Sequence, residues 1–160
     1  MNTPAIRIVR RATQDDVSTL ARFRWAFRSG RHAATEDENA FVARCVEWMR
    51  PRLRTDSRWR VWLVEEAAVP IGNLWVQIIE KIPNPGAESE LHAYVSNVFV
   101  LPEHRNKGGG ALLLDAAVAE CRSFHVDTMF LWPSDDSRPL YARHGFAPPD
   151  RVLVKQLNPS

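Results

Sequence analysis

The chain has 160 residues, of which 45% are hydrophobic and 25% are charged; this composition is ordinary for a soluble globular protein and excludes wholesale disorder. The formal net charge of +2 is smaller than expected for a dedicated nucleic-acid-binding protein, although 18 of the 21 basic residues are arginine. No apolar run approaches the roughly 18 residues of a membrane span. We therefore predict one domain over residues 1–160, with neither a nucleic acid nor a membrane as its partner.

The two cysteines, Cys45 and Cys121, lie in apolar-periodic stretches and lack the spacing of metal ligands, so we expect buried thiols and no metal site. The N-terminus shows no apolar stretch followed by a cleavage site of small residues. A reducing cytoplasm is the expected location.

The hydrophobic pattern predicts a mixed α/β sheet domain of ten elements. In chain order these are a strand at 6–10, a helix capped by Thr13 and ending at 29–30, a helix ending or kinking near Met49 before Pro51, a strand at 60–66, a strand at 71–79, a strand at 92–101, a helix at 108–124, a strand at 127–132, a helix at 137–143 and a strand at 151–157.

Two details of these elements carry further expectations. The first helix has an apolar stripe at helical spacing, and Arg24 falls on that stripe together with Phe23 and Phe27. Val69 and Pro70 predict the turn of a hairpin between the strands at 60–66 and 71–79.

The segment from Val98 to Ala111 carries the main chemical signal, because a strand enters a glycine-rich turn and a long helix leaves it. The first amides of a helix have no intrahelical partner, and the helix dipole is positive there. Gly108, Gly109 and Gly110 remove the side chains that would keep a ligand away from these amides. The pattern predicts a phosphate or pyrophosphate site, with a plain flexible loop as the alternative.

Neither of the two common nucleotide-binding loops is present. The chain has no G-x-x-x-x-G-K-[ST] loop, and it has no early G-x-G-x-x-G unit with an acidic residue about 20 positions further on. The glycine-rich turn could also belong to an unrelated phosphate-binding α/β domain, and this alternative stays open.

The turn resembles the [QR]-x-x-G-x-[GA] signature of the GNAT superfamily of N-acetyltransferases, through Arg105-x-x-Gly108-x-Gly110 after a strand ending in Val-Leu-Pro. Leu140 to Phe146 resembles the late L-Y-x-x-x-G-F motif of that family. The resemblance covers nearly the whole chain. It implies a single GNAT-like domain with a mixed, mostly antiparallel central sheet, flanked by helices and splayed between the fourth and fifth strands.

The resemblance also implies acetyl-CoA as the cosubstrate. The backbone of Val98 and Val100 is then expected to hydrogen-bond the pantetheine arm, and Ser134 is a further candidate for that arm. The pyrophosphate is expected to bind the turn and the helix start that follows it, through Arg105, Asn106, Lys107, Gly108, Gly109, Gly110 and Ala111.

Acetyl transfer to an amine needs a neutral amine, a donor for the developing oxyanion and a proton for the leaving thiolate. By resemblance, Val100 N–H is the oxyanion donor and Tyr141 is the acid, with simple packing under Phe146 as the alternative for Tyr141. The strand at 92–101 has no carboxylate that could act as the base, which leaves Tyr94 or His92 as candidates acting through water.

We therefore expect an acetyl-CoA-dependent N-acetyltransferase that acts on a primary amine of a small molecule or peptide by direct attack. The resemblance implies an acceptor pocket built from the first two helices and the loop at 81–90. In the connector between those helices, the acidic residues Glu36, Asp37 and Glu38 are candidates for binding a cationic amine, with a solvated acidic turn as the alternative. The alternative function is a non-catalytic acyl-CoA-binding sensor or binding module. Members of the family often pair, so a homodimer is an alternative to a monomer.

Overall fold

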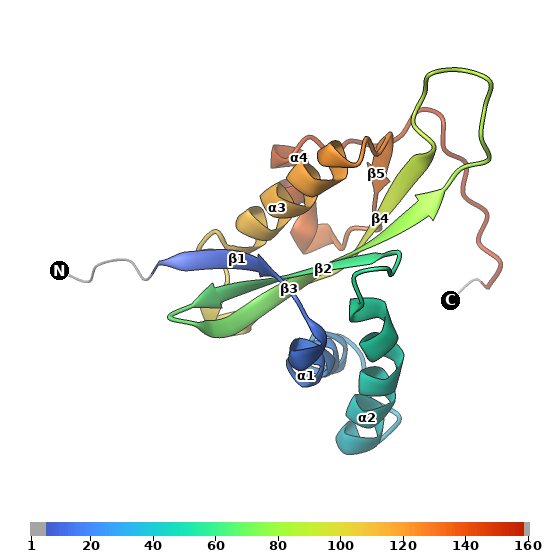
Figure 1. The fold of residues 1–160 in the computed structure, drawn as a ribbon. Helices are drawn as coiled ribbons and strands as arrows, with labels where there is room; N and C mark the ends of the chain where they lie inside the picture. The colour runs from blue at the N-terminus through green and yellow to red at the C-terminus, as the bar shows by residue number, and fades with distance from the viewer. Residues whose placement is uncertain (1–5, 159–160) are drawn as a thin grey trace.

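The computed structural model describes residues 6–158, which form a five-stranded sheet with helices on both faces (Figure 1). The strands lie in chain order across the sheet, as β1 (Arg7–Arg11), β2 (Trp59–Glu66), β3 (Val69–Glu80), β4 (Leu91–Val100) and β5 (Thr128–Phe130). The first three pairings are antiparallel and the pairing of β4 with β5 is parallel. The predicted mixed, mostly antiparallel sheet is therefore confirmed.

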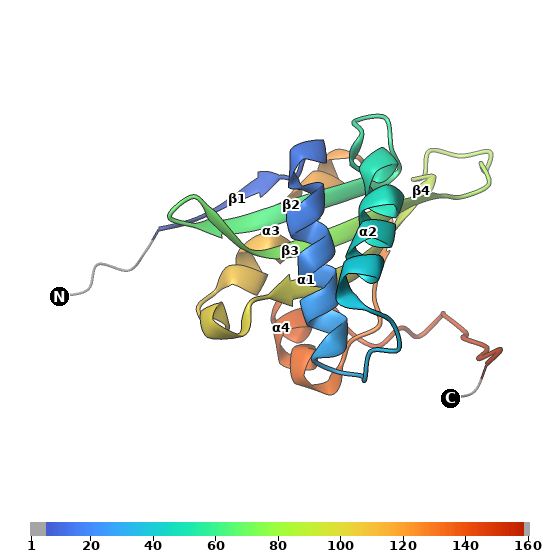
Figure 2. The ribbon, with the colours of Figure 1, turned by 90° about the horizontal axis from the view of Figure 1, so that it is seen from below.

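Helices α1 (Val17–Ser29) and α2 (Glu38–Met49) cover one face of the sheet, while α3 (Gly109–Ser123) and α4 (Arg138–Arg143) lie on the other (Figures 1 and 2). Side chains along β2 alternate between the two faces. Trp62 and Val64 belong to the core under α3, whereas Val61 and Leu63 belong to the core under α1 and α2. Burial of these two apolar layers holds the sheet between the helices. Among residues 6–158, no helix combines the length and apolar character needed to cross a membrane.

The ends of the first two helices follow the sequence signals. Thr13 and Asp16 form a capping box ahead of α1, in which Asp15 N–H donates to Thr13 Oγ1 and Thr13 N–H donates to Asp16 Oδ2. α2 ends at Met49 and continues as a short 3-10 helix (Arg50–Leu53) that contains Pro51. Both predicted boundaries are confirmed.

The turn predicted at Val69 and Pro70 is wrong. The hairpin turns two residues earlier, at Ala67 and Ala68, whose φ angles are +50° and +63°. Val69 already pairs with Glu66, and Pro70 lies beside a register shift in the β2–β3 ladder. Left-handed conformations at both turn residues match the twist of the two strands, while proline is tolerated where a regular ladder bond is missing.

The strand predicted at residues 151–157 is also wrong, because this segment has no hydrogen-bonded strand partner and runs as irregular chain. Its apolar side chains Val152, Leu153, Val154 and Leu157 are all exposed. The local pattern suits a strand, but a strand forms only where a neighbour accepts its backbone hydrogen bonds.

Candidate functional site

Strand β4 loses its β5 neighbour partway along its length. The two strands pair only over residues 92–94, so the rest of β4 has no partner on the β5 side. Leu101 N–H donates to Ile71 O of β3 at 2.8 Å, and backbone direction alternates along a strand. The polar backbone groups of Val98 and Val100 therefore face the unpaired side. The predicted opening between the fourth and fifth strands is confirmed, and it leaves a strand edge that an extended ligand can pair with.

A β-bulge lies within the part of β4 that has no β5 partner. The β3–β4 register shifts between Asn73 and Trp75, and Asn97 adopts a left-handed conformation with a φ angle of +52°. The Asn73 side chain donates from Nδ2 to Asn97 O at 2.9 Å and so holds the bulge. At Gly72 the strands approach so closely that a Cβ atom would lie 2.5 Å from Phe99 O. The bulge and this close approach fix the backbone conformation of the free edge.

The glycine-rich turn leads directly into α3. Gly108 has a φ angle of +85°, which L-residues rarely adopt, and no side chain caps the helix that follows. Gly109 is buried against Val100, and a Cβ atom at Gly109 would lie 3.6 Å from Val100 Cγ2. The uncapped first turn of α3, Gly109 to Ala111, therefore starts beside the free edge of β4, and its amides have no intrahelical partner.

The two basic side chains of the turn are not aimed at the amides. Arg105 Nε donates to Val100 O at 2.9 Å, and Lys107 Nζ donates to Glu103 O at 3.0 Å. Among the described hydrogen bonds, none uses the N–H of Asn106, Lys107 or Gly108. The turn is thus left open, while the carbonyl of Val100 is occupied and its N–H stays available.

Arg7 of β1 also contacts the turn, although no motif in the sequence marks this residue. Its guanidinium donates to Lys107 O and pairs with Glu66 at 2.6 Å. His104 Nδ1 lies 3.0 Å from the other oxygen of the same carboxylate. These contacts tie the turn to the β2 end of the sheet and fix the backbone that carries the open amides.

Tyr141 lies on α4, half-buried, with its ring 5.8 Å from that of Phe146 in an edge-on arrangement. Burial raises the pKa of Tyr141 above its ordinary value, while a hydrogen bond with Ser137 and the charge of Arg31 act in the opposite direction. The phenol is therefore protonated at neutral pH and able to donate. Ser134 Oγ donates to Ser137 Oγ at 3.0 Å, which connects the predicted cofactor residue Ser134 to the neighbourhood of Tyr141.

Tyr94, the other tyrosine, lies where the β4–β5 pairing ends. Its ring stacks on Phe130 with a centroid distance of 5.5 Å and meets Trp132 edge-on at 5.2 Å. The three rings form an aromatic cluster beside the opening, and 63% of Trp132 is exposed.

The acidic residues before α2 are engaged in local structure. Glu36 pairs with Arg44, and Asp37 caps α2 by accepting a hydrogen bond from Ala40 N–H at 3.2 Å. Both carboxylates therefore have partners within the protein when no acceptor substrate is bound. Two arginines lie at the opening instead. They are Arg24 of α1 and Arg31 of the turn that follows α1. The sequence signal for Arg24 was a cation placed on an apolar stripe.

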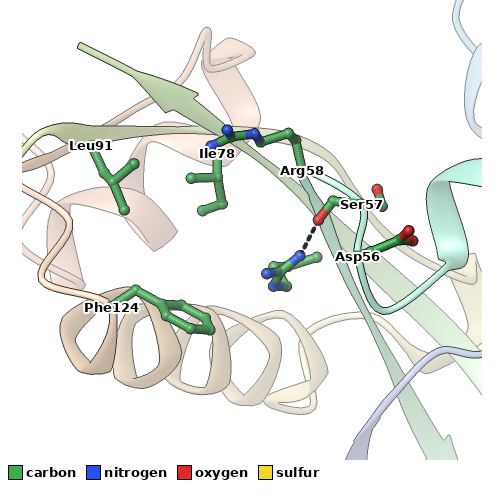
Figure 3. Close-up of a pocket in the computed structure, with 7 residues that line it drawn as sticks. Asp56, Ser57, Arg58, Ile78, Leu91 and Phe124 are labelled. Carbon is green, nitrogen blue, oxygen red and sulfur yellow. Dashed lines mark hydrogen bonds between the residues drawn. The ribbon is translucent and has the colours of Figure 1, made fainter. Parts of the chain in front are cut away.

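A separate pocket of about 260 Å³ lies at the opposite end of α3 (Figure 3). Its lining includes Phe124, just past the C-terminal end of the helix, and Arg60, which donates to Ser57 O at 2.5 Å. Arg60 also pairs with Glu120 at 3.5 Å, so its charge is compensated. Within residues 6–158, no three His, Cys, Asp or Glu side chains gather as a metal site requires. A second pocket of about 190 Å³, whose lining includes Trp25 and Glu36, lies where α1 leads into α2, as expected for the acceptor. The open turn beside β4 is the candidate cofactor site.

Solved structures with the same architecture are numerous. A GCN5-related N-acetyltransferase from Ralstonia eutropha is 27% identical with a TM-score of 0.74, over 96% of this chain and 100% of that one. A predicted acetyltransferase from Clostridium acetobutylicum, solved with acetyl-CoA, is 21% identical with a TM-score of 0.74, over 95% and 97% of the two chains. An aminoglycoside N-acetyltransferase in complex with CoA is 18% identical with a TM-score of 0.68, over 98% and 97%. The comparison with curated proteins finds no match.

The model of the acetyltransferase (GNAT) family matches residues 19–146, which span α1 to the end of the Tyr141–Phe146 segment. This match covers most of the chain and confirms the resemblance seen in the two motifs. It also confirms acetyl-CoA as the expected cosubstrate of an acetyltransferase. The chain belongs to the GNAT family of acetyltransferases.

Proposed function

We propose that the protein transfers an acetyl group from acetyl-CoA to a primary amine of a small molecule or peptide. The observation that carries this proposal is the uncapped start of α3 beside the free edge of β4. The amides from Asn106 to Ala111 would hold the pyrophosphate, the backbone of Val98 would hold the pantetheine arm, and the N–H of Val100 would bind the thioester carbonyl at the end of that arm. Arg105 contributes through its hold on the Val100 carbonyl, and Lys107 through its charge at the turn.

In the proposed reaction the neutral amine attacks the thioester carbonyl directly, so that a C–N bond forms as the C–S bond breaks. Val100 N–H stabilises the developing oxyanion, and the amine loses a proton to water. Tyr141 gives its proton to the departing thiolate, a role that fits a phenol kept protonated by burial. Tyr94, beside the opening, is the candidate for relaying the proton of the amine through water.

Acetyl-CoA binding and turnover are measured separately to test the proposal. Calorimetric titration of acetyl-CoA gives the affinity, and thiol release with a panel of amines gives the activity. Tyr141→Phe keeps the ring that packs on Phe146 and removes only the hydroxyl, so it should lower kcat while leaving the Kd for acetyl-CoA unchanged. Tyr94→Phe removes the hydroxyl of the other tyrosine in the same way and tests the proposed proton relay.

Tight binding of acetyl-CoA without any turnover would favour a sensor or binding module over an enzyme. Failure of the folded protein to bind acetyl-CoA would refute the assignment of the open turn. The free thiols of Cys45 and Cys121 suit a reducing compartment, and the cytoplasm is the location we propose.

A further inference from the structure

Arg24 lies on the face of α1 that packs toward the sheet, yet it has no acidic partner. Its guanidinium donates from Nη1 to the side chain of Asn97 at 3.3 Å, beside the bulge of β4, and lies 5.8 Å from the centre of the Phe27 ring. No carboxylate among the described residues forms an ion pair with it. Burial, followed by the charge of Arg28, lowers the pKa of Arg24 below its ordinary value. A partly desolvated cation is therefore held at the opening by neutral groups alone.

Arg31 approaches the same opening from the opposite side. Its guanidinium lies 5.0 Å from the centre of the Phe27 ring and donates to Ser134 Oγ at 3.3 Å. Among the described residues Arg31 also has no ion pair. Phe27 is thus flanked by two arginines, one reaching the β4 side of the opening and the other reaching the segment between β5 and α4.

Half of the other sixteen arginines of the described chain are compensated. Ion pairs with Asp or Glu are formed by Arg7, Arg10, Arg11, Arg44, Arg54, Arg58, Arg60 and Arg138. The two carboxylates nearest in sequence to Arg31, Glu36 and Asp37, are engaged by Arg44 and by the start of α2. Arg24 and Arg31 therefore leave positive charge without an ion pair beside the opening, which disfavours a purely cationic ligand there.

We propose that Arg24 and Arg31 bind an anionic group, a carboxylate or a phosphate, carried by the acceptor amine. This inference rests on the proposed function, which identifies the opening as the acceptor site. It adds the class of acceptor, an amine that carries a carboxylate or a phosphate. Planar guanidinium groups bind carboxylate and phosphate oxygens through paired N–H donors. Their charge also favours the uncharged form of a nearby amine, which is the form that attacks. A nearby positive charge would thus keep the amine uncharged in a site where β4 supplies no carboxylate as the base.

Paired acceptors test this proposal. The pairs are phenylalanine with phenethylamine, β-alanine with propylamine, and O-phosphoethanolamine with ethanolamine, so each pair differs in one carboxylate or phosphate. The wild type should show at least a tenfold higher kcat/KM for the anionic member of the pair whose shape it accepts. Arg24→Gln and Arg31→Gln should reduce this preference at least tenfold, mainly through KM. Arg22→Gln, an exposed arginine on the same helix, is the control and should leave the preference unchanged.

A direct binding experiment separates this inference from the proposed function. With CoA present, inorganic phosphate and acetate are titrated while the Nε–Hε resonances of Arg24 and Arg31 are followed by NMR. Shifts of both resonances in the wild type, with a weaker shift of the remaining arginine in each single glutamine variant, support the anion site. This holds even if no amine is acetylated, and that result would count against the proposed function alone. Acetylation of amines with no preference for the anionic members, or no shift at either arginine, overturns the inference.

Discussion

Replacing Gly108 with aspartate or asparagine offers a sharp test of the anion site. A Cβ atom at this position meets no heavy atom within 4 Å, so neither side chain is excluded by packing. The φ angle of +85° costs an L-residue about 1–2 kcal/mol, and Asn and Asp tolerate this region better than other residues. The two variants therefore share the same backbone cost and nearly the same shape, and they differ by one negative charge.

The size of the charge effect follows from Coulomb's law for a phosphate bound at the turn. With an effective dielectric constant of about 20, two unit negative charges about 7 Å apart repel by about 2.4 kcal/mol. This energy corresponds to about a 50-fold loss of affinity. We expect Gly108→Asp to bind acetyl-CoA about 30–100 times more weakly than Gly108→Asn at low ionic strength. The difference should shrink in high salt, because the turn is exposed.

Protein stability should respond in the opposite direction. A negative charge at the start of α3 favours the helix by about 0.3–1 kcal/mol, so the aspartate variant should unfold no more easily than the asparagine variant. Calorimetric titration with acetyl-CoA and thermal unfolding of the apo variants provide the two measurements. Equal affinities for the two variants would refute the placement of a phosphate at this turn.

Three further predictions concern other parts of the structure. Tyr141→Phe should lower kcat for acetyl transfer by about 10²–10⁴-fold, as removal of a general acid does, with an unchanged Kd for acetyl-CoA; a rise in Kd as large as the fall in kcat would make Tyr141 a binding residue. Asp16→Asn should destabilise the fold at neutral pH, because the hydrogen bonds from Arg10 lower the pKa of Asp16. Asp16 stabilises the folded state above its ordinary pKa, and this contribution is lost as the pH falls through the lowered value, so acid denaturation curves of wild type and variant should converge there. Cys121, whose pKa burial raises to about 11, should react with a thiol reagent at neutral pH only on unfolding, and rapid labelling of the native protein would contradict its buried position.

The sequence was most informative where one local signal decides the structure. Thr13 begins the first helix through its side-chain oxygen, and Pro51 limits the second because it lacks an N–H. The glycines at 108–110 predicted an open helix start, which no side chain caps in the fold. Each of these features depends on a few neighbouring residues, and their chemistry is visible in the sequence itself.

Features that depend on distant partners were not predictable in this way. The tail at residues 151–157 has the pattern of a strand, yet pairing depends on a free edge at the right distance. Arg105 carries the charge expected at the turn, but its guanidinium folds back on the carbonyl of Val100. The position of Arg24 beside Asn97 requires the packing of α1 on the sheet, which the spacing of apolar residues along the helix does not reveal.

An NMR titration of the ¹⁵N-labelled protein with acetyl-CoA tests the central claim most directly. We expect the largest amide shifts at Val98 and Val100 of β4 and from Asn106 to Ala111, and only small shifts around the separate pocket near Phe124. Shifts centred on that pocket, with the free edge of β4 and the start of α3 unaffected, would contradict the account.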